Sequence, residues 1–271
     1  PNSKMELTIL QQIILGLIQG ITEWLPISSS GFVALAASNW FNITSVDALV
    51  RTALFFHLGT FLAALIYFRK EVGDLFYTLF KYKSSSEVYK KTFNFILIAT
   101  IISGIIGILI LQLLTGIDSA LELTGKTITG AIAILLLVTG IIQLKPKNKG
   151  LKTEHNLNLK DSILLGIAQG LATLPGLSRS GTTVSVLLLR KFDDTTALKL
   201  SFLLSLPIVL IGNILLNAKD FAATSFPIWG LLASFVFGLL TIHGLMKLSK
   251  KINFAWFALI FGLLMLVSLL I

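Results

Sequence analysis

The sequence predicts an all-α integral membrane protein. Its 271 residues are 55% hydrophobic and only 13% charged, whereas soluble domains carry about 25% charged residues. The apolar residues come in runs of about 20, the length that crosses a bilayer as an α-helix. These runs are too long and too uniformly apolar for the alternating strands of an outer-membrane barrel. The composition therefore excludes an ordinary soluble enzyme, a coiled coil and a disordered chain.

Six runs have the length of a full transmembrane helix, and we expect these helices at 48–68, 92–114, 126–144, 198–217, 226–246 and 252–271. Two further apolar stretches, 8–40 and 162–189, are interrupted in the middle by proline, glycine and hydroxyl side chains. Non-helical backbone occurs at membrane depth only where it is buried in protein or lines a cavity. Both stretches are therefore predicted to be re-entrant helical hairpins.

The distribution of basic residues supports this topology. Four loops hold 17 of the 22 Lys and Arg residues: 69–91, 145–161, 190–199 and 247–251. If both hairpins are re-entrant, all four loops lie on one side, which the positive-inside rule identifies as cytoplasmic. We therefore expect a multi-pass protein of the plasma membrane with both termini outside. The net charge of +9 then reflects orientation and indicates no nucleic-acid partner.

The chain contains an internal repeat, in which residues 15–20 align with 165–170 at an offset of 150. We expect a single membrane domain, 1–271, with repeat halves at 8–144 and 162–271; residues 1–4 are expected to be an expression scar. Each half has one re-entrant hairpin, which returns to its own side, and three spans. Because three crossings end on the other side of the membrane, the second half starts from the opposite side. This predicts an inverted-topology repeat whose two hairpin tips meet in one site.

One carboxylate and one guanidinium are placed at these tips. Glu23 is the only acidic residue expected at membrane depth, and Arg179 is the only basic one. Ionisable groups there are costly and mark functional sites. The repeat is expected to bring the two residues together in a functional site. The alternative is an ion pair that only stabilises packing.

Hydroxyl and glycine residues are dense around both charges. Hydroxyls, free amides at helix N-termini and an arginine together predict a phosphate site; the alternative is helix capping alone. The residues expected to bind substrate are Gln19, Ser30, Gly31, Ser178, Ser180 and Thr183.

Glu23 would repel a phosphate, which leaves two alternatives. A divalent cation could bridge the carboxylate and the phosphate, or Glu23 could be protonated or act as a base. Gln19, four residues earlier, would orient a ligand or be a hydrogen-bonded buried amide. His57 within the span at 48–68 is expected to be structural.

Two segments carry a resemblance to a known family. Residues 19–31, QGITEWLPISSSG, and residues 175–183, PGLSRSGTT, resemble the signature motifs of the undecaprenyl-diphosphate phosphatase family, the bacitracin-resistance type. The resemblance covers nearly the whole chain. It implies hydrolysis of a polyprenyl diphosphate lipid to the monophosphate at an outward-facing intramembrane site, which recycles the lipid carrier of cell-wall glycan synthesis.

The resemblance also implies Mg²⁺ or Ca²⁺ as cofactor and a homodimer. Glu23 and Arg179 would be catalytic, together with Ser28 or Ser29 or a water as nucleophile, and Glu23 would hold the metal.

One position departs from the family pattern. Members commonly have His after the serine–glycine run, whereas this chain has Phe32. This favours a less active member, a binding homologue without activity, or a site in which another group replaces the His. A transporter or lipid flippase is the rival function, because inverted repeats with broken helices are typical of transporters.

Overall fold

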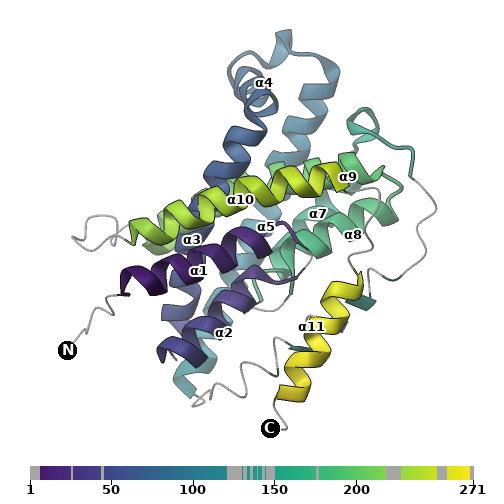
Figure 1. The fold of residues 1–271 in the computed structure, drawn as a ribbon. Helices are drawn as coiled ribbons and strands as arrows, with labels where there is room; N and C mark the ends of the chain where they lie inside the picture. The colour runs from purple at the N-terminus through teal and green to yellow at the C-terminus, as the bar shows by residue number, and fades with distance from the viewer. Residues whose placement is uncertain are drawn as a thin grey trace.

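The computed structural model is built from helices in the part of the chain that it describes (Figure 1). That part comprises residues 7–25, 27–43, 46–120, 150–174, 177–217, 227–248 and 255–268, with short pieces between 130 and 144. The helices are α1 (Ile9–Thr22), α2 (Ser29–Phe41), α3 (Val46–Tyr67), α4 (Arg69–Phe80), η1 (Tyr82–Ser84), α5 (Glu87–Ala120), η2 (Glu154–Asn156), α7 (Leu159–Leu171), α8 (Arg179–Leu189), α9 (Asp194–Asn217), α10 (Ile228–Leu248) and α11 (Ala255–Ser268).

Four of the described helices, α3, α5, α9 and α10, are long and apolar enough to cross a membrane. They confirm the predicted spans at 48–68, 92–114, 198–217 and 226–246. The predicted span at 126–144 lies mostly outside the described residues, as do residues 1–4. The last predicted span is described only as the 14-residue helix α11. The chain is thus a multi-pass helical membrane protein.

The two interrupted stretches form pairs of short helices, as predicted. α1 ends at Thr22 and α2 begins at Ser29, while α7 ends at Leu171 and α8 begins at Arg179. None of the four exceeds 14 residues, so none is longer than about 21 Å at 1.5 Å per residue. A hydrocarbon core is about 30 Å thick, and these helices are too short to cross it.

Glycines let the first helix of each pair lie against a long span. On α1, a Cβ atom at Gly16 would collide with the backbone of Gly230 on α10, and Gly20 also faces the α10 backbone. On α7, Gly166 and Gly170 face α5 in the same way. Small residues four positions apart allow such close approach between membrane helices. Figure 1 shows α1 alongside α10.

The surface of the bundle is apolar and its interior contains many polar groups. On α5, the side chains of Ile101, Ile105, Leu109 and Leu113 are 54–67% exposed, which suits a surface covered by lipid. The interior holds buried hydroxyls such as Thr60, Ser201 and Ser234. Buried hydroxyls commonly bond to helix carbonyls in membrane bundles, as Thr60 does to the carbonyl of His57 at 3.0 Å.

Three of the basic loops are joined by direct contacts. Lys91 Nζ donates to the carbonyl of His155 at 2.7 Å, and Lys199 pairs with Glu154. A bridge between Lys152 and Phe192 adds a further link. Loops 69–91, 145–161 and 190–199 therefore lie at the same end of the bundle, as the charge pattern predicts.

Candidate active site

The two helix breaks meet inside the bundle. Arg179, at the start of α8, forms an ion pair with Glu23, which follows α1. Ser180 Oγ donates to the carbonyl of Leu25 at 2.7 Å, so the second break is also hydrogen-bonded to the first. The neighbour relation between Glu23 and Arg179, expected from the repeat, is present in the structure.

Glu23 accepts contacts from four side chains around its carboxylate. Oε2 accepts from Gln19 Nε2 at 2.7 Å and from Ser29 Oγ at 2.6 Å, and it lies 3.0 Å from His57 Nε2. Oε1 is paired with Arg179. The side chain of Glu23 is only 3% exposed. A buried charge requires such partners, since burying it alone costs several kcal/mol or more.

His57 belongs to the site, although the sequence analysis favoured a structural role for it. Its Nδ1 lies 2.6 Å from the carbonyl oxygen of Ala53, while Nε2 faces Glu23. Because both neighbours are acceptors, a proton must lie on each contact. His57 and Glu23 together are then neutral, and Arg179 leaves the site with a net positive charge.

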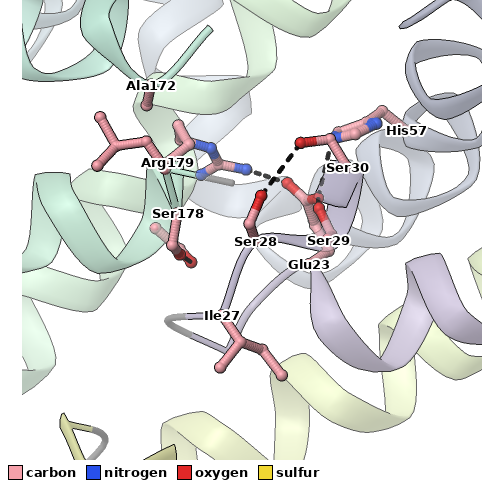
Figure 2. A pocket seen from close by; sticks show the side chains of 11 residues that line it. Glu23, Ile27, Ser28, Ser29, Ser30, His57, Ala172, Ser178 and Arg179 are labelled. Atoms are coloured by element: carbon pink, nitrogen blue, oxygen red, sulfur yellow. Dashed lines mark hydrogen bonds and ion pairs between the residues drawn. The ribbon is translucent and has the colours of Figure 1, made fainter. Parts of the chain in front are cut away.

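The sequence contained one signal that would have found His57. It is an ionisable side chain within an apolar span, and that criterion already singled out Glu23 and Arg179. Figure 2 shows His57 and Arg179 on opposite sides of the Glu23 side chain.

The serine residues at the two breaks have different roles. Ser28 Oγ accepts from the amide of Gly31 at 3.2 Å, and Ser178 Oγ accepts from the amide of Gly181 at 3.1 Å. These two hydroxyls are the N-caps of α2 and α8. Ser29, one residue further on, donates instead to Glu23. Of the two hydroxyls considered as nucleophile, only that of Ser29 contacts the carboxylate.

A small polar cavity lies between the two breaks (Figure 2). Its volume is about 60 Å³, which is room for a few waters or one phosphate group. The N-termini of α2 and α8 both border it, and helix N-termini favour anions. The polar side chains that line it are Glu23, Ser28, Ser29, Ser30, His57, Ser178, Arg179 and Ser180.

Three residues expected to bind substrate do not line this cavity. Gln19 is fully buried behind Glu23. Gly31 contributes its amide to the N-cap of α2. Thr183 Oγ1 lies 2.6 Å from Ser201 Oγ and donates to the carbonyl of Arg179 at 2.8 Å, so it supports the first turn of α8.

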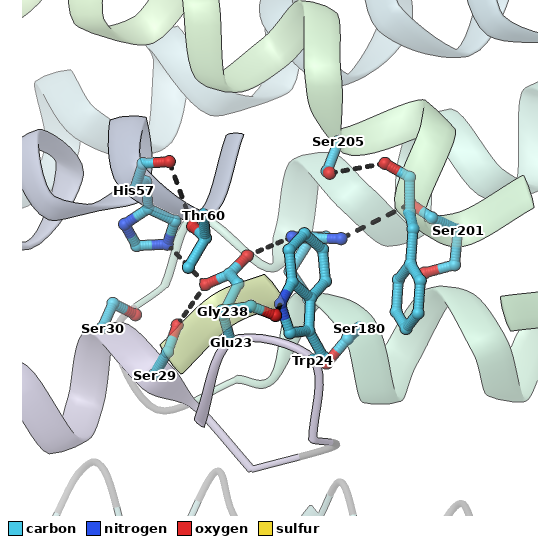
Figure 3. Close-up of polar contacts among 12 residues, drawn as sticks. Glu23, Trp24, Ser29, Ser30, His57, Thr60, Ser180, Ser201, Ser205 and Gly238 are labelled. Atoms are coloured by element: carbon cyan, nitrogen blue, oxygen red, sulfur yellow. Dashed lines mark hydrogen bonds and ion pairs between the residues drawn. The ribbon is translucent and has the colours of Figure 1, made fainter. Parts of the chain in front are cut away.

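Trp24 fixes the loop that carries Glu23. Its indole Nε1 donates to the carbonyl of Gly238 on α10 at 2.9 Å (Figure 3). Its ring meets Phe202 on α9 edge-on, at 4.8 Å between centroids. Trp24 is 2% exposed. The loop is therefore attached to both α9 and α10, which limits how far Glu23 can move.

Within the described residues, no group of three or more His, Cys, Asp or Glu side chains is arranged to hold a metal ion. Gln19 Oε1, however, is buried and has no hydrogen-bond partner there. An amide oxygen next to a carboxylate suits a hard cation that takes its other ligands from substrate phosphates and water. Glu23 and Gln19 would therefore suit a cation that is completed by substrate and water. They are too few to hold a cation with protein ligands alone.

Phe32 does not line the cavity. Its side chain packs against the hydrophobic cluster that includes Leu15, Val33 and Phe56. The imidazole that borders the cavity comes from His57 on α3.

The chain is similar to known proteins over most of its length. The chain matches the family described as "Bacitracin resistance protein BacA" over residues 12–266. It is 39% identical over 264 residues to the undecaprenyl-diphosphatase of Methanococcoides burtonii, covering 95% of this chain and 97% of that protein. The undecaprenyl-diphosphatases of Methanothrix thermoacetophila and Haloarcula marismortui are 36% and 38% identical, with 94% of each chain covered. This chain belongs to the bacitracin resistance protein BacA family.

Proposed function

We propose that this chain hydrolyses a polyprenyl diphosphate of the undecaprenyl type to its monophosphate and inorganic phosphate. The observation that carries the proposal is the pairing of Glu23 with Arg179 in a small cavity between two helix N-termini. The guanidinium and the helix ends favour phosphate, and the carboxylate supplies a base. The relatives named undecaprenyl-diphosphatase indicate the substrate class.

Glu23 is the general base in this mechanism. Ser29 Oγ donates to Glu23 Oε2 at 2.6 Å, so Ser29, or a water beside it, passes its proton to Glu23 as it attacks the terminal phosphorus. The bond from that phosphorus to the bridging oxygen breaks, and the lipid monophosphate leaves with the electron pair. If Ser29 attacks, water then cleaves the phosphoserine.

Arg179 has two roles in turn. Before substrate binds, it pairs with Glu23 as a second cationic partner beside His57. An incoming diphosphate competes for the guanidinium, and as it binds, the carboxylate loses a cationic partner and becomes a stronger base. Arg179 then stabilises the negative charge that develops on the phosphate oxygens.

We propose Mg²⁺ or Ca²⁺ as cofactor, held by Glu23 and the amide oxygen of Gln19. The support is the free, buried Oε1 of Gln19 beside the carboxylate. When bound, such a cation neutralises charge on the substrate's phosphate oxygens.

We also propose the finer topology: six full spans and two re-entrant hairpins in an inverted repeat, the termini outside the plasma membrane, and a homodimer. The first short helix of each repeat half packs on a long span of the other half: α1 lies on α10, and α7 lies on α5. This reciprocal packing supports the inverted repeat. The joined basic loops support a single cytoplasmic side. The outward-facing active site stays a prediction that rests on the family resemblance.

Phosphate release by the purified protein tests this function. With farnesyl or undecaprenyl diphosphate and Mg²⁺, we expect steady release, and chelation with EDTA should lower it by at least about 100-fold because a bound cation contributes several kcal/mol. Release that is insensitive to EDTA would contradict the cofactor but not the hydrolysis. Lipid that crosses proteoliposomes without phosphate release would indicate a transporter, and binding alone would indicate an inactive homologue.

Replacing His57 by alanine removes a proton-bearing partner of Glu23. We expect kcat to fall by about 100-fold or more, because the base Glu23 loses the partner that orients it and balances its charge. His243 provides the matched control, since it is exposed on α10 beside the ring of Tyr67 and outside the cavity. Equal activity in the two alanine variants would show that His57 has only a structural role.

A further inference from the structure

Arg179 is held at two points by one residue of α9, Ser201. The carbonyl oxygen of Ser201 accepts from Arg179 Nη1 at 3.4 Å. The hydroxyl of Ser201 lies 2.6 Å from Thr183 Oγ1, and Thr183 donates in turn to the backbone carbonyl of Arg179 at 2.8 Å. Ser201 and Thr183 are both fully buried. Ser201 therefore contacts the guanidinium directly and the backbone of Arg179 through Thr183.

The hydrogen bond between the two hydroxyls has a fixed direction. A hydroxyl carries a single proton, and Thr183 gives its proton to backbone carbonyls of the first turn of α8, at the shortest distance to that of Arg179. Ser201 is therefore the donor to Thr183. The Ser201 hydroxyl, the Thr183 hydroxyl and the Arg179 carbonyl form one chain of hydrogen bonds, in which each bond polarises the next. This chain joins the start of α8 to α9.

The next residue of α9 contacts the segment that carries Glu23. Phe202 meets the ring of Trp24 edge-on, and Trp24 directly follows Glu23 in the chain. Two consecutive residues of α9 thus hold the two segments from which the carboxylate and the guanidinium project. The spacing between these charged groups therefore depends on α9, which belongs to neither helix break.

We infer that Ser201 is a positioning residue, which holds the Arg179 guanidinium where the terminal phosphate of the substrate binds. The inference rests on the proposed function. Ser201 does not line the small polar cavity, so it acts on phosphate through Arg179. The two terminal nitrogens of Arg179 have different partners, since Nη2 pairs with Glu23 and Nη1 donates to Ser201. When a phosphate displaces Glu23 from Nη2, the contact at Nη1 remains and keeps the guanidinium in place.

Removal of one hydroxyl tests this role. Ser201→Ala keeps the backbone carbonyl but deletes the donor to Thr183. We expect kcat with farnesyl diphosphate to fall at least about tenfold, because a misplacement of about 1 Å in a catalytic group lowers rates by up to about 100-fold. Thr183→Val should have a similar effect, and Thr183→Ser should restore most of the activity because it keeps the hydroxyl.

Ser205→Ala is the matched control for Ser201→Ala. Ser205 lies one turn further along α9 (Figure 3), is also buried, and donates to the carbonyl of Phe202 at 2.7 Å. We expect it to keep the wild-type kcat. An equal loss of kcat in the two alanine variants would overturn the inference.

The Arg179→Ala background separates positioning from packing. If Ser201 acts through Arg179, Ser201→Ala should lower kcat no further once Arg179 is alanine, since residues that act as one unit have non-additive effects. A serine that only stabilises the fold would cause the same fold-loss in both backgrounds, and that result would overturn the inference.

Binding of inorganic phosphate gives a readout that does not require turnover. Phosphate should stabilise wild type and Ser205→Ala against thermal unfolding. Ser201→Ala should need at least about tenfold more phosphate for the same shift, since one misaligned hydrogen bond to a charged group has an effect of that size. Equal phosphate dependence in the three proteins would overturn the inference. If wild type releases no phosphate from farnesyl diphosphate and the phosphate dependence still changes only in Ser201→Ala, the proposed function fails and the role of Ser201 stands.

Discussion

Replacing Arg179 by alanine should lower phosphate release from a polyprenyl diphosphate by at least about 1,000-fold, the effect of removing an arginine that stabilises a transferring phosphoryl group. Arg179 is the guanidinium at the polar cavity, and it stands at the N-terminus of α8. Arg179→Lys should recover only a small part of the activity, because an ammonium cannot contact two phosphate oxygens in the planar geometry of arginine. The measurement is kcat with farnesyl or undecaprenyl diphosphate at saturating Mg²⁺.

The same fold contains a matched control for this variant. Arg190 Nε pairs with the buried carboxylate of Asp161 at 2.6 Å, at the other end of the α7–α8 pair and outside the cavity. Arg190→Ala leaves the buried carboxylate of Asp161 without its charged partner, which costs about 3–5 kcal/mol in stability. Arg179→Ala should cost less stability, because Glu23 keeps its contact with His57. Arg190→Ala should therefore lose stability but keep its kcat in the folded fraction. If both variants lose activity in proportion to stability, the role of Arg179 is structural.

Replacing Glu23 by glutamine should lower kcat by about 100- to 10,000-fold, as expected for loss of a general base. The substitution keeps the size of the side chain and one acceptor oxygen, so Ser29 and Gln19 retain a partner. It also removes the negative charge beside Arg179. Inorganic phosphate should then inhibit the variant at a lower concentration than it inhibits wild type, because the guanidinium no longer has a competing carboxylate.

A catalytic base at position 23 predicts lower turnover together with tighter phosphate binding in Glu23→Gln. A residue that only supports packing does not predict this combination. Asp161→Asn is the control, since Asp161 is also a fully buried carboxylate that contacts an arginine. It should change neither kcat nor inhibition by phosphate. Wild-type turnover in Glu23→Gln would contradict the mechanism, and weaker inhibition by phosphate would contradict the pairing with Arg179 in the substrate-free state.

The arrangement of helices in the described part of the chain was largely predictable. Four spans lie where hydropathy placed them, because in lipid the length of an apolar run alone decides whether a helix can cross. The helix breaks after Thr22 and Leu171 were also predictable, since proline, glycine and hydroxyl residues interrupt helices locally. The pairing of Glu23 with Arg179 followed from the repeat.

The roles of individual side chains at the site were not predictable. Ser28 and Ser29 are equivalent in the sequence, yet one caps α2 and the other contacts Glu23. Consecutive residues at a helix start point about 100° apart, so the rotation of α2 decides which hydroxyl meets the carboxylate. The same rotation directs Phe32 into the hydrophobic cluster.

The sequence by itself determined that this protein is a helical membrane protein with two broken helices, one carboxylate and one arginine at its centre, since these depend on local composition and on the cost of burying charge. Only the tertiary structure decided that His57 shares the carboxylate, that Gln19 lies behind it, and that a larger cavity between α3, α5 and α9 adjoins the small one. Those features depend on how α1, α3, α5 and α9 pack, and packing between distant segments leaves no periodic signal in the chain.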